Sequence, residues 1–203
     1  MIRVEALPAR APSDATSQLR AFAELFEACA CTCFCRWWHF EGTKNDWLAR
    51  AANEPHANRD EHARLAREGD PRAGGLLALD GETAVGWMKL TPRAAVPKLR
   101  RLPVYRGLDL GDDAGVWGVG CFLVRPDRRG QGVARALLVA ADAHVRAAGG
   151  LAIEAYPRRS AETMHAEEAW MGPEKLFLEC GFEPVEAPVG LGAAPYPVLR
   201  KHM

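Results

Sequence analysis

The segment from residue 115 to 157 restricts the fold more than any other part of the chain. It begins with the apolar run GVWGVGCFLV, which is typical of a buried strand. The glycine-rich stretch RPDRRGQG follows, and residues 131–148 then place apolar side chains at helical spacing. The run GGLAIEAYP predicts a second strand. A strand, a helix and a strand in this order form a crossover, so we expect the two strands to be parallel neighbours in one sheet.

The rest of the chain predicts antiparallel strands and further helices around this unit. Asp80 and Gly81 stand between two apolar runs and predict a tight hairpin turn. Pro197 in the terminal segment 196–203 suits a strand at the edge of the sheet. We therefore expect one domain over residues 1–203, of mixed α/β (α+β) class with a mostly antiparallel central sheet. The other expected elements are strands at 2–7 and 182–187, helices at 16–30, 58–70 and 174–180, and a long loop at 92–115.

Composition excludes some classes of partner. The 26 basic and 26 acidic residues balance, so there is no net charge to attract nucleic acid or a membrane surface. No stretch approaches the roughly 18 apolar residues of a membrane span. The N-terminal residues lack the apolar region of a signal peptide, which predicts a cytoplasmic protein whose six cysteines are reduced.

The stretch RRGQGVA, residues 128–134, predicts an anion site. It leaves a strand and opens a helix, where backbone N–H groups lack partners and the helix dipole favours negative charge. A Walker loop would need a lysine after Gly132, and none follows. A dinucleotide fingerprint beginning at Gly130 would need glycine or alanine at position 135, which is Arg135. The spacing that fits is Arg-x-x-Gly-x-Ala, residues 129–134.

Two motifs in order carry a resemblance to a known family. The segments FLVRPDRRGQGVARALL and KLFLECGFEPV are similar to the central loop and the late helix of the GNAT superfamily of acyl-CoA-dependent N-acetyltransferases. With the hairpin and the first helices also in order, the resemblance covers nearly the whole chain. It implies a GNAT fold whose parallel strand pair splays apart, an acetyl-CoA donor, and the primary amine of a small molecule or peptide as acceptor.

The resemblance also implies which residues bind the donor. The pantetheine arm would pair with main-chain groups of Phe122, Leu123 and Val124, and an amide there would stabilise the oxyanion. The third phosphate would meet Arg128, Arg158 or Arg159. The pyrophosphate would lie on the amides of Arg129, Gly130, Gln131, Gly132, Val133 and Ala134.

Proton transfer selects two candidate catalytic residues. An alkyl amine with a pKa near 10.4 is about a thousandfold too protonated near neutral pH, which costs roughly 4 kcal/mol. A base or a water relay is therefore needed. Glu154 and Tyr156 share one face of the strand that should flank the acyl group, and Glu154 is the candidate base.

The sequence departs from the family where a proton donor is usual. The tyrosine that protonates the leaving thiolate is here Phe177, and Trp170 stands where an asparagine is usual. The thiolate would then leave unassisted or take its proton from Tyr156, Cys180 or water. These departures keep a second class open, a GNAT-fold protein that binds acyl-CoA without turnover or senses thiols or metals.

Cys29, Cys31, Cys33 and Cys35 stand at every second position of the stretch CACTCFC. An extended strand would spread their sulfurs over roughly 20 Å, at ~3.3 Å per residue, and a helix would turn alternate ones to opposite faces. Neither arrangement forms the tetrahedron that zinc requires. We expect no metal, although a turn with His39, or a reversible disulfide, stays an alternative.

The residues that follow the cysteines are expected to line the acceptor side of the cleft, because they come after the first helix in the resembling family. Trp37, Trp38 and His39 would form an aromatic wall for an amine-bearing or planar acceptor, with Arg36 available for a carboxylate or phosphate. The alternative is that these aromatics pack the helices onto the sheet. A homodimer is also open.

Overall fold

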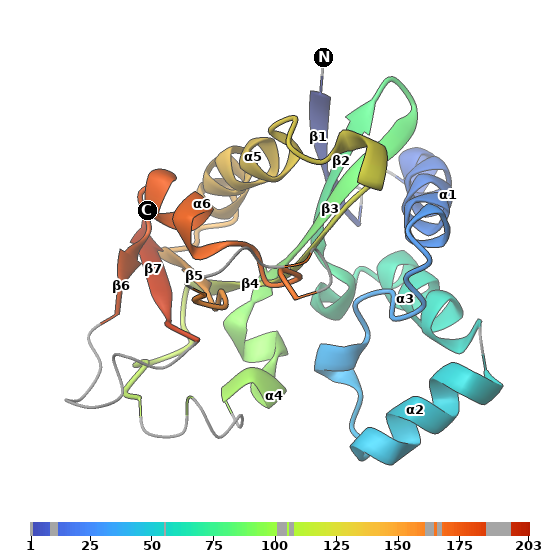
Figure 1. Cartoon of the computed structure of the whole chain (residues 1–203), viewed down its shortest axis with the longest axis horizontal. Helices are drawn as coiled ribbons and strands as arrows, with labels where there is room; N and C mark the ends of the chain where they lie inside the picture. The colour runs from blue at the N-terminus through green and yellow to red at the C-terminus, as the bar shows by residue number, and fades with distance from the viewer. Residues whose placement is uncertain are drawn as a thin grey trace.

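The computed structural model describes residues 2–8, 12–54, 56–100, 105, 108–160, 165, 168–185 and 196–203. A seven-stranded sheet in the order β1-β2-β3-β4-β5-β7-β6 runs through the molecule (Figure 1). All of its pairs are antiparallel except β4 with β5. The strands are β1 (Ile2–Leu7), β2 (Gly75–Asp80), β3 (Thr83–Pro92), β4 (Val116–Val124), β5 (Ala152–Ala155), β6 (Glu183–Pro184) and β7 (Leu199–His202).

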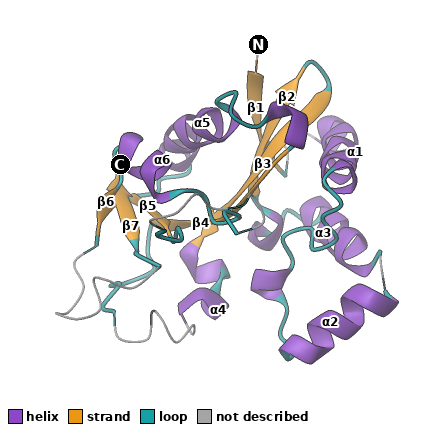
Figure 2. Ribbon diagram, viewed as in Figure 1, coloured by secondary structure: helices purple, strands orange, loops and turns teal. Residues whose placement is uncertain are grey.

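Helices cover both faces of the sheet (Figure 2). Alternate side chains of a strand point to opposite faces, so Leu77 of β2 packs with Phe22 on the side of α1, whereas Leu76 packs with Leu137 on the side of α5. The helices are α1 (Pro12–Ala28), α2 (Lys44–Asn53), α3 (Ala57–Arg67), α4 (Pro97–Arg100), α5 (Val133–Ala147) and α6 (Glu174–Glu179). None of the described helices has the length and apolar character to cross a membrane.

The predicted crossover is confirmed, and its strand pair is short. Val116, Trp117 and Gly118 of β4 pair in parallel register with β5. β4 then continues to Val124 on the β3 side only, while no described residue of β5 follows it. The two strands therefore part in the middle of β4, and the second half of β4 has a backbone edge that β5 does not cover.

Most of the other predicted elements are present, with two corrections. The hairpin turns at Gly81, which has a φ of 63°. The prediction that the terminal strand lies at the edge of the sheet is wrong, because β7 lies between β5 and β6. Its nearest proline, Pro197, comes before the strand begins and so leaves the hydrogen bonding of β7 intact. The expected loop at 92–115 contains the short helix α4 within its described residues.

Candidate active site

The glycine loop lies at the N-terminus of α5, where it was predicted. Gly130 and Gly132 have φ values of 72° and 81°, a left-handed conformation that favours glycine. A β-carbon at either position would meet no atom within 4 Å. The first helical hydrogen bond runs from the amide of Ala136 to the carbonyl of Gly132 (2.9 Å), so the helix offers no partner to the amides that precede Ala136.

A cavity of about 460 Å³ opens on this loop, and we call it the glycine-loop cavity. Its walls are the end of β4, the loop and the residues that lead into α6. Gln131 is not among its lining residues, because its side chain donates to the carbonyl of Asp127 (2.8 Å). The predicted donor residues that do line it are Phe122, Leu123, Val124, Arg129, Gly130, Gly132, Val133 and Ala134.

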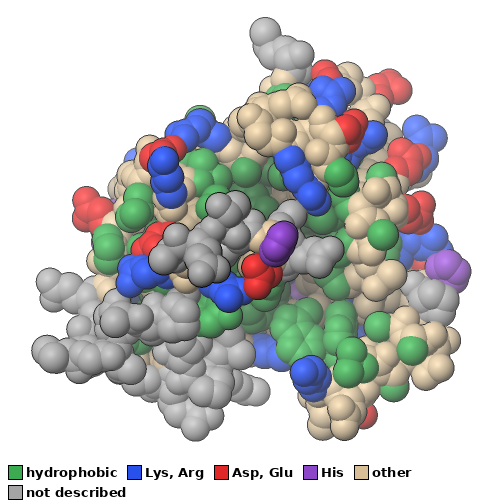
Figure 3. Space-filling model, in the orientation of Figure 1, with side chains coloured by type: hydrophobic (Ala, Val, Ile, Leu, Met, Phe, Trp, Pro, Cys, Tyr) green, Lys and Arg blue, Asp and Glu red, His purple; other side chains and the backbone are tan. Residues whose placement is uncertain are grey.

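A second cavity of about 860 Å³ adjoins the first, and we call it the aromatic cavity. Phe122, Leu123 and Arg129 line both cavities. All three belong to the part of the chain beyond the last residue of β4 that pairs with β5. Figure 3 shows hydrophobic side chains gathered on this face of the molecule, between α4 and α2 as these are placed in Figure 1. The cavities therefore occur where the parallel strands have parted.

Four tryptophans line the aromatic cavity, and their rings contact each other in two pairs. The rings of Trp38 and Trp170 lie 5.5 Å apart, and those of Trp37 and Trp47 lie 5.4 Å apart. The indole N–H of Trp38 donates to the carbonyl of Gly120 (3.2 Å), which ties its ring to β4. Trp37 and Trp38 thus stand in the cavity wall, as the sequence predicted.

Sequence reasoning missed several lining residues. Trp47 comes from α2, Phe26 from α1 and Cys121 from β4, while Trp170 and His165 come from the segment before α6. The sequence identified Trp170 only as a departure from the family pattern and did not predict that it lines the cavity. No local pattern could have joined these residues, because they meet only when four separate segments fold together.

Main-chain groups at the end of β4 already have partners within the protein. The amide of Phe122 donates to the carbonyl of Trp170 (2.7 Å), and Nε of Arg129 donates to the carbonyl of Val124 (3.3 Å). Both contacts lie on the edge that β5 leaves uncovered. A ligand that used these groups would have to exchange these two hydrogen bonds.

The structure does not support Glu154 and Tyr156 as catalytic residues. Glu154 is fully buried, and its carboxylate accepts hydrogen bonds from Arg93 (2.9 Å), Arg200 (2.9 Å) and the hydroxyl of Tyr156 (2.6 Å). Neither residue lines either cavity. Burial raises the pKa of Tyr156 well above its usual range. Both residues lie beside the paired half of β4, where the two strands close on each other.

The structure places Arg36 and His39, which were predicted to bind the acceptor, outside the lining of the aromatic cavity. The guanidinium of Arg36 is buried, donates to Glu61 (2.6 Å) and the carbonyl of Arg72 (3.1 Å), and does not line the cavity. His39 does not line it either, and burial lowers its pKa to about 2. In the motif RWWH only the two tryptophans line the cavity, and Arg36 ties the turn to Glu61 and Arg72.

The cysteine row, Cys29, Cys31, Cys33 and Cys35, lines one wall of the aromatic cavity. Phe34 and Cys35 have φ values of 44° and 52°, so the chain turns here and does not form a regular strand or helix. The sulfurs of Cys31 and Cys33 lie 3.5 Å apart. Among the described residues, no group of three or more Cys, His, Asp or Glu side chains is placed to hold a metal ion.

The thiols of this row are held in their protonated form. The hydrogen bond with Cys33 and burial raise the pKa of Cys31. The hydrogen bond with Cys31 lowers the pKa of Cys33, but the hydrogen bond with Cys35 and burial outweigh it and raise the value to about 12. Burial and the hydrogen bond with Cys121 raise the pKa of Cys35. Because the thiolate is the nucleophile and the metal ligand, these side chains act as neutral wall groups.

The three arginines expected near the third phosphate differ in position. Arg128 lines the glycine-loop cavity and pairs with Asp80 (2.9 Å). Arg158 and Arg159 do not line it, and they pair with Glu168 (2.9 Å) and Glu174 (2.7 Å). Of these three arginines, only Arg128 is therefore placed to meet a ligand on the loop.

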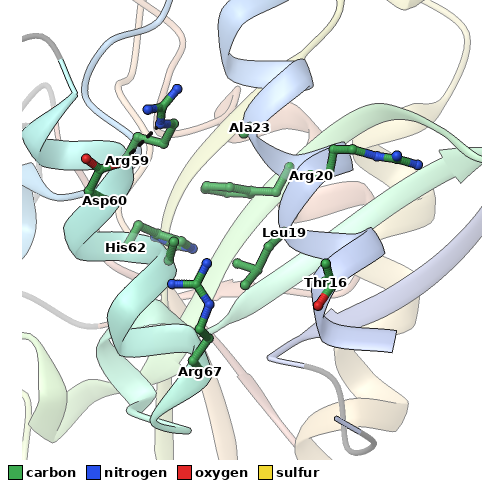
Figure 4. Close-up of a pocket in the computed structure, with 10 residues that line it drawn as sticks. Thr16, Leu19, Arg20, Ala23, Arg59, Asp60, His62 and Arg67 are labelled. Atoms are coloured by element: carbon green, nitrogen blue, oxygen red, sulfur yellow. Dashed lines mark hydrogen bonds and ion pairs between the residues drawn. The ribbon is translucent and has the colours of Figure 1, made fainter. Parts of the chain in front are cut away.

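A third cavity, of about 340 Å³, lies between α1 and α3 (Figure 4). Leu19 and Arg20 come from α1, and His62 and Arg67 come from α3. It shares no lining residue with the other two cavities. It is a gap between two helices, separate from the glycine loop.

The structure thus combines a mixed sheet with one short parallel pair, a glycine loop at the start of α5 and two joined cavities. The sequence model of the acetyltransferase (GNAT) family matches residues 17–169. The chain therefore belongs to the GNAT family of acetyltransferases, and the predicted family and fold are confirmed. Among curated proteins, none matches this sequence significantly.

Solved structures share this fold over almost the whole chain. The PaiA N-acetyltransferase of Thermoplasma acidophilum, in complex with coenzyme A, is 11% identical with a TM-score of 0.50, covering 100% of this chain and 99% of that one. An aminoglycoside 6'-N-acetyltransferase complexed with coenzyme A is 12% identical with a TM-score of 0.50, covering 98% and 96%. Aminoglycoside 6'-acetyltransferase type Ii is 14% identical with a TM-score of 0.51, also covering 98% and 96%. At such identities the likeness concerns the fold.

Proposed function

We propose that this enzyme transfers an acetyl group from acetyl-CoA to a primary amine of a small molecule or a peptide. The observation that carries the proposal is that the two cavities share Phe122, Leu123 and Arg129. A donor on the glycine loop and an acceptor among the aromatic rings would meet beside β4. The solved relatives that hold coenzyme A support this choice of donor.

The donor pyrophosphate would lie on the amides of residues 129–134. These amides stand at the N-terminus of α5, where the helix dipole favours an anion, and the two glycines leave space for it to approach the backbone. Arg128 would meet the third phosphate by exchanging its contact with Asp80. The anion site would therefore be local, and it would not require an excess of basic residues in the whole chain.

The pantetheine arm would run along the uncovered edge of β4 at residues 122–124. To do so it would replace the contact of the Phe122 amide with Trp170 and that of Arg129 with Val124. The Phe122 amide would then be free to donate to the thioester oxygen as negative charge develops on it. Donor binding should therefore displace the segment that contains Trp170.

The leaving thiolate would take its proton without help from a tyrosine. Phe177 is fully buried against Phe122 and has no hydroxyl group, and the hydroxyl of Tyr156 is bound to Glu154. The remaining source of a proton for the thiolate is the amine itself, which loses one proton in the reaction. This proton can reach the sulfur directly or through water.

The test is mass-spectrometric detection of acetylated product with acetyl-CoA and a panel of amine, peptide and aminoglycoside acceptors. A direct product assay is needed because the enzyme's own thiols would disturb a thiol-release assay. Product above the buffer control with at least one amine supports the proposal. Calorimetric binding of acetyl-CoA with no product from any amine would contradict it and favour a protein that binds acyl-CoA without turnover.

A further inference from the structure

The walls of the aromatic cavity are suited to a flat, apolar ring. Trp37, Trp38, Trp47 and Trp170 contribute indole rings, and the cysteine row forms another wall. A cavity of about 860 Å³ can enclose a ligand of one or two rings. Aromatic side chains prefer offset or edge-to-face contact with another ring, which selects planar ligands. The inference drawn below rests on the proposed function, because it concerns the acceptor of that reaction.

Two of the rings are held in position by polar contacts outside the cavity space. The indole of Trp38 is tied to the carbonyl of Gly120. The ammonium of Lys98 lies 3.5 Å from the centre of the Trp37 ring and donates to the carbonyls of Trp37 (3.0 Å) and Phe40 (3.2 Å). One aromatic face of Trp37 therefore already binds a cation. The aromatic cavity is therefore preorganised, and one of its cation-binding faces is in use.

The described lining residues offer a cationic ligand no counter-ion. Their ionisable groups besides the protonated thiols are Arg129 and His165, and none of them is a carboxylate. An ammonium group buried here would lose its water and face the positive charge of Arg129. Burial of an unpaired charge is costly, so the lining favours an uncharged amine.

The proton balance of the reaction leads to the same kind of amine. An alkyl ammonium must first give one proton to a base before its lone pair can attack, and Glu154 cannot serve because it is buried with Arg93 and Arg200. An amine whose lone pair is delocalised into an aromatic ring is already neutral near pH 7. It attacks the thioester carbon, the carbon–sulfur bond breaks, and the one proton lost by nitrogen is the one that sulfur gains. No external base is consumed.

We propose that the acceptor is an aromatic amine whose nitrogen is conjugated with its ring, bound in the neutral form between the tryptophans and the cysteine row. The ring of the acceptor lies in the aromatic cavity, and the amine nitrogen points to the stretch of β4 shared by the two cavities. Aliphatic amines of equal size are poor substrates.

A pair of isomers tests this directly. 5-Aminoindane and 2-aminoindane have the same formula and ring system, but the first is an aryl amine and the second an alkyl amine. With saturating acetyl-CoA near neutral pH, kcat/KM for the aryl isomer should exceed that for the alkyl isomer at least about tenfold. Equal rates, or faster acetylation of 2-aminoindane, would overturn the inference and leave the proposed function standing. If acetyl-CoA binds but no amine is acetylated, the proposed function fails and the inference falls with it.

A pair of variants tests the cause of the preference. Cys31→Asp adds a carboxylate to the wall that lacks one, whereas Cys31→Ser keeps the wall neutral at nearly the same size. The ratio of aryl to alkyl kcat/KM should fall about tenfold in Cys31→Asp and stay unchanged in Cys31→Ser. An equal ratio in both variants, with both folded by circular dichroism, would show that the missing counter-ion does not set the preference.

Discussion

The two halves of β4 do different work although they form one continuous strand. The first half, Val116 to Gly118, pairs with β5 and is closed by the buried cluster of Glu154, Arg93 and Arg200. The second half, which ends at Val124, is left by β5 and borders both cavities. Strand pairing satisfies the backbone and leaves no room for a ligand, whereas its loss creates an open edge. The length of the β4–β5 pairing therefore decides where along β4 a ligand can bind.

Removing charge from the closed half should have the largest effect on stability. Glu154→Gln removes the buried carboxylate that Arg93 and the partly exposed Arg200 share, so we expect the free energy of unfolding to fall by about 3 kcal/mol. The kcat per folded molecule should change less than about threefold, because the residue lines neither cavity. Urea unfolding and acetylation assays measure the two effects.

The exposed pair of Arg135 and Glu179 provides the control for this prediction. Glu179→Gln should change the free energy of unfolding by less than about 1 kcal/mol, because solvent screens exposed pairs. A stable Glu154→Gln enzyme with kcat reduced a hundredfold would return Glu154 to the catalytic residues and erase the contrast between the two halves.

Lys89 lies at the boundary between the two halves of β4, and its burial should make stability depend on pH. Lys89 packs against Gly120, is 1% exposed, and donates to the carbonyl of Arg72 (2.9 Å). Burial lowers its pKa from 10.5 to about 8. Below pH 8 the lysine is charged in both states, and burying it lowers stability. Between pH 8 and 10.5 the folded protein releases this proton first, so the penalty disappears and stability rises.

The Lys89→Met variant isolates that contribution. The free energy of unfolding of the native enzyme minus that of Lys89→Met should increase by about 3 kcal/mol between pH 7 and pH 10.5, because 2.5 pKa units separate the two states. A difference that stays flat with pH would mean that water from the aromatic cavity reaches Lys89.

A methyl group on the glycine loop should weaken donor binding specifically. Gly132→Ala places its β-carbon in the glycine-loop cavity at a left-handed φ, so we expect the Kd for acetyl-CoA to rise about tenfold. Gly149→Ala is the matched control at the other end of α5, with a φ of 73° and the same open surroundings. Calorimetry should show native affinity in Gly149→Ala. Equal weakening in both would point to backbone strain and not to the loop as the cause.

The reaction beside the second half of β4 should need little help from a general base. His165 is the one described imidazole that lines the aromatic cavity. If the acceptor arrives as a neutral aryl amine, His165→Gln should lower kcat by less than about threefold, far below the hundredfold or more typical of a general base. Steady-state rates with 5-aminoindane measure this. A loss of a hundredfold would instead identify His165 as the base.

The glycine loop could be predicted from the sequence because its geometry is local. Gly130 and Gly132 stand between a strand and a helix within one short segment, and the backbone itself makes the site. The crossover and the hairpin at Gly81 were predictable for the same reason. The terminal strand was placed wrongly because its position depends on which neighbours it finds in the sheet, and Pro197 lies outside its hydrogen bonding.

The acceptor side could be predicted only in part because it depends on tertiary contacts. Trp37 and Trp38 were found from their place after the first helix, but Trp47 and Trp170 arrive from elsewhere in the chain. The alternation of Glu154 and Tyr156 was correct as a strand pattern. Nothing in it says that β5 leaves β4 after three pairs, which puts both residues on the closed half.

We propose that donor and acceptor occupy separate cavities that meet at the second half of β4, and the KM values of three variants test this arrangement. Trp47→Ala should raise KM for the amine about tenfold and leave KM for acetyl-CoA unchanged, while Gly132→Ala should do the reverse. Leu48→Ala, on the exposed side of the same helix as Trp47, should change neither constant. If Trp47→Ala raised both constants together, or left KM for the amine unchanged, the assignment of the aromatic cavity to the acceptor would be contradicted.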